Sequence, residues 1–363
     1  MAVYNGMPYL REALDSLLRQ TFREFELIVV DDGSEDETPQ VLAEYKARDS
    51  RIHLLRNEQN LKLPASLNRG LRACRAGLVA RADADDFYAP DWLLRQYEFM
   101  QSHPEIGKLG TGGWEVDTVG QKSKQFASPS NDALIRLIMP FRCCINHAGG
   151  MYRRDLVLEA GGYSEAFLKV EDYDLWARLL PLTQFASLQE PLWCYRTLPS
   201  SESRSYNHAD GSRMCSVSGR LLCERLGRSL TENEVKAACE IFCSWGPVDS
   251  GSVRLGIRLC FEYLRKSRPV AEEKAWTEFK RLLAQALLRQ SVHQVPHSRL
   301  MSLAAMRAAF VLSPREMLSR QGGLQLFRLL VPGRIWRALK KTRVGTASQA
   351  TPATDGCHRS HSE

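Results

Sequence analysis

The sequence predicts an α/β protein with a doubly wound, mostly parallel sheet, and two observations support this prediction. Between residues 1 and 90, short apolar runs typical of buried strands alternate with stretches that have the apolar period of helices. Two of the apolar runs end in clustered aspartates, at Asp31-Asp32 and at Asp83 to Asp86. Because ligands of such sheets gather at the carboxyl ends of the strands, we expect both clusters to line one edge and form one site.

The first hundred residues supply most of this sheet. The continuous apolar run 27–30 is typical of a strand that is covered on both faces. Pro8 is placed at a first helical position, and Thr38-Pro39 at the N-cap and first turn of the next helix. Met1-Ala2-Val3 reads as only the end of a central strand, so we expect a truncated first strand or a true start upstream. The expected strands are 27–30, 52–55 and 78–82, and the expected helices are 8–18, 38–48 and 64–75.

The second hundred residues alternate less regularly between strand and helix patterns, and the sequence pattern changes again near residue 200. We expect an α/β domain over 1–200, a polar linker over 201–214, a helical C-terminal region over 215–345 and a disordered tail over 346–363. We expect a strand and a turn over 106–113 and 114–120, and helices over 131–139, 155–160 and 171–180.

The composition is that of a soluble globular protein. The chain has 363 residues, of which 44% are hydrophobic, enough for an α/β domain and a second region of similar size. No apolar run reaches the ~18 residues of a membrane-spanning helix, and no signal peptide is recognisable. The ten cysteines lack zinc-site spacing, so we interpret them as reduced thiols of a cytoplasmic protein.

The aspartates after residue 82 suit a divalent cation. Asp83 and Asp85, at positions i and i+2, point to the same side of an extended backbone. Two hard oxygen ligands at a strand end are typical of a Mg²⁺ or Mn²⁺ ion that carries a diphosphate. Asp86 is interpreted as a helix-capping or supporting carboxylate. A polar turn without a metal is the competing interpretation of this motif taken alone.

The ordered set of acidic motifs resembles the family 2 glycosyltransferases, which have the GT-A fold and use sugar nucleotides. The resemblance covers about residues 1 to 200. It rests on Tyr4-Asn5-Gly6, on Phe25 through Ser34 with its Asp-Asp-Gly-Ser turn, on Asn60 through Gly70, on Asp83-Ala84-Asp85-Asp86 and on Glu171-Asp172-Tyr173-Asp174. The glycine that usually follows Asn-Leu in the family is Lys62 here, and Lys62 either reaches phosphate or faces solvent.

The resemblance assigns roles to residues along the predicted sheet edge. It implies that Asp85 is the chief metal ligand, that Asp83 contacts ribose or metal, and that Asp32 accepts a hydrogen bond from the nucleobase, usually uracil. Further donor contacts are implied for Ala2, Tyr4, Asp31, Asn60, Asn68 and Arg81.

The resemblance also places the catalytic base on the acceptor side. It implies that Asp172 takes the proton of the acceptor hydroxyl and that Glu171 orients the acceptor or the helix end, with inversion at the anomeric carbon. Both could instead be carboxylates that stabilise a helix N-terminus, which would also keep Asp172 ionised. His147 lies near this region in the sequence, but a structural histidine is the simpler interpretation.

Two other functions and a membrane contact remain open at this stage. A sugar-phosphate nucleotidyltransferase would need a Gly-rich basic loop that Tyr4 to Pro8 lacks, and a non-catalytic GT-A scaffold need not keep every acidic motif. We expect a nucleotide-sugar donor and a glycan or lipid-linked acceptor as partners, and no nucleic acid. From Arg315 to Arg343, basic and apolar residues interleave around one acid, Glu316, so this segment suits either peripheral contact with the inner face of the cytoplasmic membrane or a solvated helical cap.

Overall fold

The computed structural model describes residues 1–198, 208–243, 250–294 and 299–314. The chain divides into two compact units, the first made of Met1–Cys243 with Leu255–Lys280 and the second of Ser244–Arg254 with Arg281–Glu363. All the sites described below lie in the first unit.

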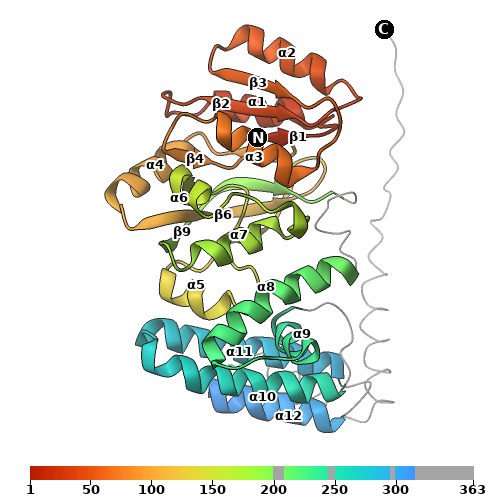
Figure 1. Cartoon of the computed structure of the whole chain (residues 1–363), viewed down its shortest axis with the longest axis vertical. Helices are drawn as coiled ribbons and strands as arrows, with labels where there is room; N and C mark the ends of the chain where they lie inside the picture. The colour runs from red at the N-terminus through yellow and green to blue at the C-terminus, as the bar shows by residue number, and fades with distance from the viewer. Residues whose placement is uncertain (199–207, 244–249, 295–298, 315–363) are drawn as a thin grey trace, which may run out of the picture. The chain divides into compact units, whose positions relative to one another are not determined.

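A three-stranded parallel sheet opens the first unit (Figure 1). Its order is β1-β2-β3, with Ala2 opposite Val30 and Leu27 opposite Ile52. The strands are β1 Ala2–Val3, β2 Leu27–Asp31 and β3 Ile52–Arg56, and the helices between and after them are α1 Leu10–Leu18, α2 Thr38–Arg48 and α3 Leu63–Ala73. The parallel β-α units expected from the sequence are confirmed here.

Both faces of β2 are covered, because its alternate side chains enter different cores. Leu27 and Val29 belong to one cluster with Leu14 of α1 and Leu42 of α2. On the other face α3 packs close to the sheet, and a Cβ on Gly70 would lie 3.3 Å from Cγ2 of Val30. This double burial is what the continuous apolar run predicted.

Two helix starts differ from the expectation. Pro8 precedes the first helix, which begins at Leu10 after a turn in which the amides of Tyr9 and Leu10 bond the carbonyl of Gly6. Thr38 is the first residue of α2 rather than its N-cap. Its Oγ1 accepts a hydrogen bond from the amide of Gly6 at 2.8 Å, so a tertiary contact takes the place of the cap.

The second sheet is mixed, so the sheet as a whole is less parallel than the sequence predicted, although the α/β class is confirmed. Its order is β4-β8-β6-β9-β5, and β7 pairs with β6. Only β6 and β9 run parallel, and the β6–β7 connection is a tight turn in which the amide of Gly120 bonds the carbonyl of Asp117. A tight turn can only join antiparallel strands. The strands are β4 Leu78–Ala80, β5 Phe87–Tyr88, β6 Ile106–Val116, β7 Lys122–Phe126, β8 Met151–Arg153 and β9 Gln184–Arg196.

Helices cover this sheet and continue beyond it. Those expected over 131–139 and 171–180 are confirmed as α5 and α7. The helices up to residue 198 are α4 Trp92–Ser102, α5 Asp132–Ile138, α6 Arg154–Glu159 and α7 Glu171–Leu179, with a short 3₁₀ turn η1 at Glu165–Phe167. Those after it are α8 His208–Leu226, α9 Glu232–Phe242, α10 Ser250–Ser267, α11 Glu273–Gln294 and α12 Arg299–Leu312, with a 3₁₀ turn η3 at Arg268–Val270.

The predicted polar linker 201–214 is partly wrong, because α8 already begins at His208. The polar residues that suggested a linker are used in tertiary pairing: Asp210 is 1% exposed and lies 2.9 Å from Arg213 and 3.5 Å from Lys169. The division into domains near residue 200 stays a prediction. The basic segment 315–343 and the tail 346–363 lie outside the described residues.

Membrane crossing and disulfides can be assessed for the described part of the chain. There, none of the helices combines the length and the apolarity that a membrane crossing requires. Every cysteine in this part is a free thiol.

Candidate functional site

The loop that follows β2 is fastened to the end of β1. The amide of Asp32 donates to the carbonyl of Val3 at 2.8 Å, and the amide of Asn5 donates to Oγ of Ser34 at 2.9 Å. Asp31 is 4% exposed, and its Oδ1 accepts from the amide of Ser34 at 2.9 Å. The buried side chain of Asp31 therefore stabilises the turn through this hydrogen bond.

Ala2 and Tyr4 lie at the same sheet edge as these aspartates. Ala2 is opposite Val30 in the register, one residue before Asp31. The side chain of Tyr4 is 47% exposed, so it is accessible to a ligand beside the turn.

Asp32 receives hydrogen bonds from the segment between β3 and α3. Its Oδ1 accepts from Nδ2 of Asn57 at 2.6 Å and from the amide of Leu61 at 2.9 Å. Asn57 also donates to Oγ of Ser66 at 2.7 Å and accepts from Arg69. Within the part of the chain that the structure describes, Oδ2 of Asp32 makes no hydrogen bond, so it can accept one from a ligand.

Asn60 closes the other side of this turn. Its Oδ1 accepts from the amide of Lys62 at 3.0 Å, and Lys62, whose side chain is exposed, has a left-handed φ of 73°. Gly33 has a φ of +75°, and a Cβ there would lie 2.8 Å from the carbonyl carbon of Gln59. Only glycine therefore lets the Asp-Asp-Gly-Ser turn and the Asn60 loop approach this closely.

Asn68 is held in a structural contact rather than directed at the turn. Its Nδ2 donates to the carbonyl of Tyr163 at 2.7 Å, and its Oδ1 accepts from the amide of Tyr163 at 2.9 Å. Both ends of the amide thus tie α3 to the loop after α6. The resemblance places Asn68 with the donor-binding residues, and this contact could not be predicted because it joins residues 95 positions apart in the chain.

The acidic turn after β4 is supported from inside by Arg81. Arg81 is 3% exposed, and its guanidinium forms an ion pair with Asp83. Its main chain is fixed too, since its amide donates to Gly150 at 2.9 Å and its carbonyl accepts from Gly149 at 3.0 Å. The side chain of Asp83 is 31% exposed, so Asp83 faces outward from a buried cation.

The next two carboxylates repel each other in a buried setting. Burial, with the neighbouring charge of Asp83, raises the pKa of Asp85 to about 6. Burial and the charges of Asp83 and Asp85 raise the pKa of Asp86 well above its ordinary value. Oδ2 of Asp86 is buried and has no hydrogen-bond partner in the described part of the chain. A bound cation would relieve this repulsion, so the chemistry of the turn fits a divalent ion.

The protein would supply only part of the coordination of such an ion. Among the described residues, no group of three or more His, Cys, Asp or Glu side chains comes close enough to hold a metal. Asp85 and Asp83 are the available ligands. Mg²⁺ typically binds through one or two carboxylates and completes its shell with water and phosphate oxygens.

Arg196, at the end of β9, fixes the acidic turn from the opposite side. Its amide donates to Oδ1 of Asp86 at 2.9 Å, and its Nε donates to the carbonyl of Asp85 at 2.9 Å. Nη1 donates to the carbonyls of Asp117 and Thr118 at 3.1 Å, and Nη2 pairs with Glu12. No sequence pattern predicts this role, because a charged residue at the end of a strand normally faces solvent.

Asp172 and Glu171 begin α7. Oδ1 of Asp172 accepts from the amide of Tyr173 at 2.7 Å, and its Oδ2 lies 3.8 Å from Sγ of Cys143. Burial raises the pKa of Asp172 despite these hydrogen bonds and despite the attraction of Lys108. Burial therefore counteracts the stabilisation of the ionised form that the helix start was expected to provide. A raised pKa makes Asp172 a stronger base once it is deprotonated.

A buried polar cluster lies beside Asp172. Lys108 of β6 is fully buried, and its Nζ lies 4.5 Å from the ring centre of Trp176 on α7. None of the described residues places a hydrogen-bond acceptor within reach of this Nζ. Burial lowers the pKa of Lys108 to about 7. His147 bonds the hydroxyl of Tyr163 at 3.0 Å, and burial lowers its pKa well below the ordinary value, which suits a neutral structural histidine.

Electrostatics connect the acidic turn with the start of α7. After burial, the positive charge of Arg81 contributes to the lowered pKa values of both Lys108 and His147. Asp172 opposes the shift at Lys108. Because Arg81 is paired with Asp83, the two acidic motifs lie in one electrostatic neighbourhood.

The sequence compares with known proteins over this same region. Residues 1–160 match the sequence profile described as Glycosyl transferase family 2. The chain is 32% identical over 209 residues to the O-antigen biosynthesis glycosyltransferase WbnJ of Escherichia coli, covering 56% of this chain and 81% of the relative. It is 35% identical over 176 residues to the amylovoran biosynthesis glycosyltransferase AmsE of Erwinia amylovora, covering 48% of this chain and 64% of the relative.

Solved structures share the fold at low identity. Residues 1–349 of S. aureus TarS, in complex with UDP-GlcNAc, align with a TM-score of 0.53 and 19% identity, covering 87% of this chain and 90% of that TarS segment. GalNAc-T7, with UDP, GalNAc and Mn²⁺, aligns with a TM-score of 0.51 and 12% identity, covering 74% of this chain and 55% of the neighbour.

Proposed function

The chain belongs to glycosyl transferase family 2 and has the GT-A fold, and from this premise we propose that it transfers a sugar from a nucleoside-diphosphate sugar to a hydroxyl group, with inversion. The donor we propose is a UDP-sugar and the acceptor a glycan or a lipid-linked glycan precursor. Support for such an acceptor comes from two relatives that are named for O-antigen and amylovoran biosynthesis.

The donor side of the proposal rests on the turn after β2 and the loops beside it. Oδ2 of Asp32 is free to accept from a nucleobase N–H, and the exposed ring of Tyr4 borders the same turn. Asp83 is directed outward by its buried ion pair with Arg81. Asp31 and Asn60 shape these loops, and we propose that Asn68 acts on donor binding only by fixing α3.

The acceptor side rests on one observation above all: a half-buried carboxylate with a raised pKa stands at the start of α7, in the electrostatic neighbourhood of the acidic turn. Asp172 would take the proton of the acceptor hydroxyl. The hydroxyl oxygen then forms the new bond to the anomeric carbon while the bond to the diphosphate oxygen breaks. The nucleoside diphosphate leaves with that electron pair. Attack from the face opposite the leaving group inverts the anomeric centre.

A divalent ion fits the acidic turn. Held by Asp85 and Asp83, Mg²⁺ or Mn²⁺ would supply positive charge against the leaving diphosphate. Asp86 and Arg196 fix the shape of the turn that presents these two ligands.

Family membership decides among the functions that the sequence had left open. A nucleotidyltransferase of similar sheet topology and a non-catalytic scaffold were both compatible with parts of the pattern. The chain is a glycosyltransferase by family, so neither alternative is retained.

The test is a screen of nucleotide sugars with Mg²⁺ and Mn²⁺, in which the released nucleoside diphosphate is measured with and without glycan acceptors. Asp172→Asn keeps the size and hydrogen bonding of the side chain but cannot take a proton. We expect turnover to fall by roughly 10²–10⁴-fold while UDP affinity, measured by calorimetry, stays unchanged. Glu171→Gln should be milder.

Two results would contradict this assignment. Turnover of Asp172→Asn within a few-fold of the parent would place the base elsewhere. Loss of UDP binding in Asp172→Asn would mean that the residue belongs to the donor side.

A further inference from the structure

Two cysteines meet where helices α8 and α9 pack against each other. A Cβ on Gly219 of α8 would lie 3.3 Å from Cγ2 of Val235 on α9, so the two helices approach closely at this point. Cys215 lies one helical turn before Gly219, and Cys239 lies one turn after Val235. Residues four apart share a face of a helix. Both cysteines are therefore on the contacting faces, one turn farther from the connecting loop than the close contact.

The two thiols interact and have unequal environments. Cys239 is 1% exposed, whereas Cys215 is half-buried. A hydrogen bond between the two thiols lowers the pKa of Cys215 and, together with burial, raises the pKa of Cys239 well above its ordinary value. Cys239 therefore keeps its proton and donates it to the sulfur of Cys215. Cys215 is the thiol that ionises first, and the thiolate is the form that reacts with oxidants.

Hydrogen bonds connect the buried thiol with the start of α7. The hydroxyl of Ser218 bonds the thiol of Cys239 and also the hydroxyl of Tyr173, the latter at 2.8 Å. The hydroxyl of Tyr173 donates to the carbonyl of Met139 at 2.5 Å, and its amide donates to Oδ1 of Asp172 at 2.7 Å. Ser218 and Tyr173 are both 1% exposed, so these bonds are shielded from water. The thiol of Cys239 thus helps to fix the residue that follows the proposed base.

We propose that Cys215 and Cys239 are a redox-sensitive pair, which hydrogen peroxide converts to a disulfide between α8 and α9, and that this disulfide loosens the start of α7. The thiolate of Cys215 attacks one oxygen of the peroxide, which leaves a sulfenic acid and, after protonation, one molecule of water. The thiol of Cys239 then attacks the sulfenic sulfur, the S–S bond forms, and a second water leaves. Two thiols are oxidised by two electrons, and one hydrogen peroxide is reduced to water.

The disulfide alters the contact between Cys239 and Ser218. The two sulfur atoms must approach to about 2 Å, which is closer than a thiol hydrogen bond brings them. This draws the sulfur of Cys239 toward Cys215 and leaves it a weak acceptor without a proton. In the described part of the chain, the hydroxyl of Ser218 then loses one of its two side-chain partners. The network that fixes Tyr173 becomes less constrained.

The first test treats the reduced full chain with hydrogen peroxide and identifies linked peptides by mass spectrometry. We expect a pair of peptides joined through Cys215 and Cys239, two hydrogen atoms lighter than the separate peptides, which dithiothreitol separates again. Cys215→Ser should not form this link. Oxidation of other cysteines while Cys215 and Cys239 stay free thiols would overturn the proposal.

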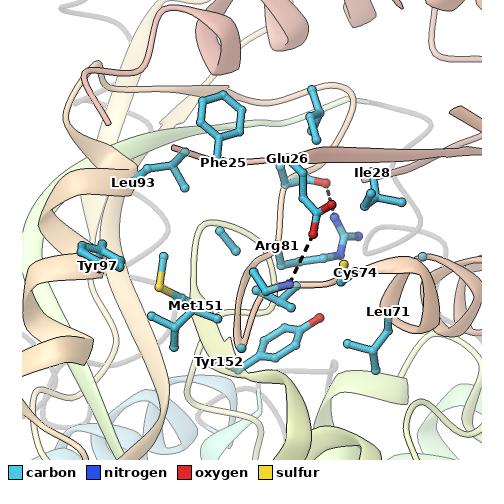
Figure 2. Close-up of a pocket in the computed structure, with 18 of the residues that line it drawn as sticks. Phe25, Glu26, Ile28, Leu71, Cys74, Arg81, Leu93, Tyr97, Met151 and Tyr152 are labelled. Atoms are coloured by element: carbon cyan, nitrogen blue, oxygen red, sulfur yellow. Dashed lines mark hydrogen bonds between the residues drawn. The ribbon is translucent and has the colours of Figure 1, made fainter. Parts of the chain in front are cut away.

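Cys74→Ser is the matched control. Cys74 is also a half-buried thiol, but it lines a cavity beside Leu71 whose lining includes none of the other described cysteines (Figure 2). Burial raises the pKa of Cys74, so it should react with peroxide more slowly than Cys215. Cys74→Ser should therefore form the same disulfide as the parent chain. Loss of the disulfide in this variant would also overturn the proposal.

Hydrogen exchange tests the connection to α7. In the segment that contains the Tyr173 amide, we expect exchange at least about fivefold faster in the oxidised chain, restored by dithiothreitol and insensitive to peroxide in Cys215→Ser. Unchanged exchange in a chain that carries the disulfide would overturn this part of the proposal. An accompanying, reversible fall in turnover rests on the proposed function of Asp172. A reduced chain without turnover would contradict that function, whereas the disulfide and the exchange are measured without it.

Discussion

Asp85 is expected to make the stability of the protein depend on pH. Its folded pKa of about 6 lies above the ordinary value of 3.8, so the folded state binds more protons than the unfolded state between these values. Stability therefore falls as the pH rises from about 4 to 6 and stays lower above it. Asp85→Asn should thus stabilise the chain by about 1–3 kcal/mol at pH 7.5 and much less at pH 4, while abolishing metal-dependent turnover.

Urea unfolding at the two pH values measures this effect. Asp155→Asn is a matched control, because the side chain of Asp155 is 87% exposed and should show no such dependence. The same stability difference at both pH values would mean that the Asp85 carboxylate is not destabilised by burial and by Asp83.

Lys108 is expected to tune the proposed base. Its positive charge lowers the pKa of Asp172, which burial raises. In Lys108→Met, a change of similar shape, the acid limb of the pH profile of kcat/KM should move to higher pH. Lys124→Met is the control, since Lys124 is 71% exposed. An acid limb that stays at the same pH in Lys108→Met would show that Lys108 does not influence the pKa of Asp172. Loss of the acid limb in Asp172→Asn is a separate test of the base itself.

The roles of single residues were predictable where the residues belong to a short sequence motif. Paired aspartates after apolar runs indicated the two acidic motifs directly. Asn57, Arg196 and Lys108 could not be found in this way, because each acquires its role from partners far away in the chain. Arg196, for example, contacts Asp85 and Asp86 across 110 residues of sequence.

At the level of secondary structure, the end of β9 is coupled to the acidic turn through Arg196. Arg196→Lys keeps the charge but loses the fork that reaches the carbonyls of Asp85, Asp117 and Thr118. We expect a loss of about 2–4 kcal/mol in stability, since buried acceptors are left unpaired, and weaker binding of UDP with Mn²⁺. Denaturant unfolding and calorimetry measure the two effects.

Arg95→Lys is the control for this variant, because Arg95 pairs with Glu190 at a site where its side chain is 45% exposed. Its stability should change by less than about 0.5 kcal/mol. If Arg196→Lys behaves like this control in both measurements, the contacts of Arg196 do not position the acidic turn.

Helices and strands were predictable where an apolar period or run is long, and less so where tertiary contacts decide. β2 and α7 begin within a residue of their expected positions. Helix α1 begins at Leu10 and not at Pro8, because the amides of Tyr9 and Leu10 bond the carbonyl of Gly6 in a separate turn. Thr38 lost its role as a cap because its hydroxyl is used by Gly6.

For the whole molecule, the α/β class followed from alternating patterns, but the mixed second sheet did not. Strand direction there depends on the short connection at Asp117 to Gly120 and on the return of β9 beside β6, a pairing between residues far apart in sequence. Neither leaves a periodic signal in the chain. The electrostatic connection between the acidic turn and the start of α7 likewise became visible only in the folded structure.

The balance of charge along the whole chain suggests a final test. The net charge is +7, and between Arg315 and Arg343 eight basic residues stand against one acid, interleaved with apolar residues such as Phe327 and Trp336. This segment lies outside the described residues. Such a pattern suits an anionic membrane surface, where each basic residue contributes about 1 kcal/mol. We predict that the full chain co-sediments with liposomes containing phosphatidylglycerol, and that a chain ending at Ser313 does not.

Two further measurements distinguish binding of the segment to a membrane from a helical cap that is exposed to water. Binding should weaken as salt rises, because exposed charges are screened. A full chain with Lys340→Gln and Lys341→Gln should bind about 30-fold more weakly, since two basic contributions of about 1 kcal/mol each are removed. Neutral liposomes should bind little of the full chain or of this double variant. Equal sedimentation of the full and shortened chains on anionic liposomes would reject the membrane interpretation and favour a cap whose basic face is exposed to water.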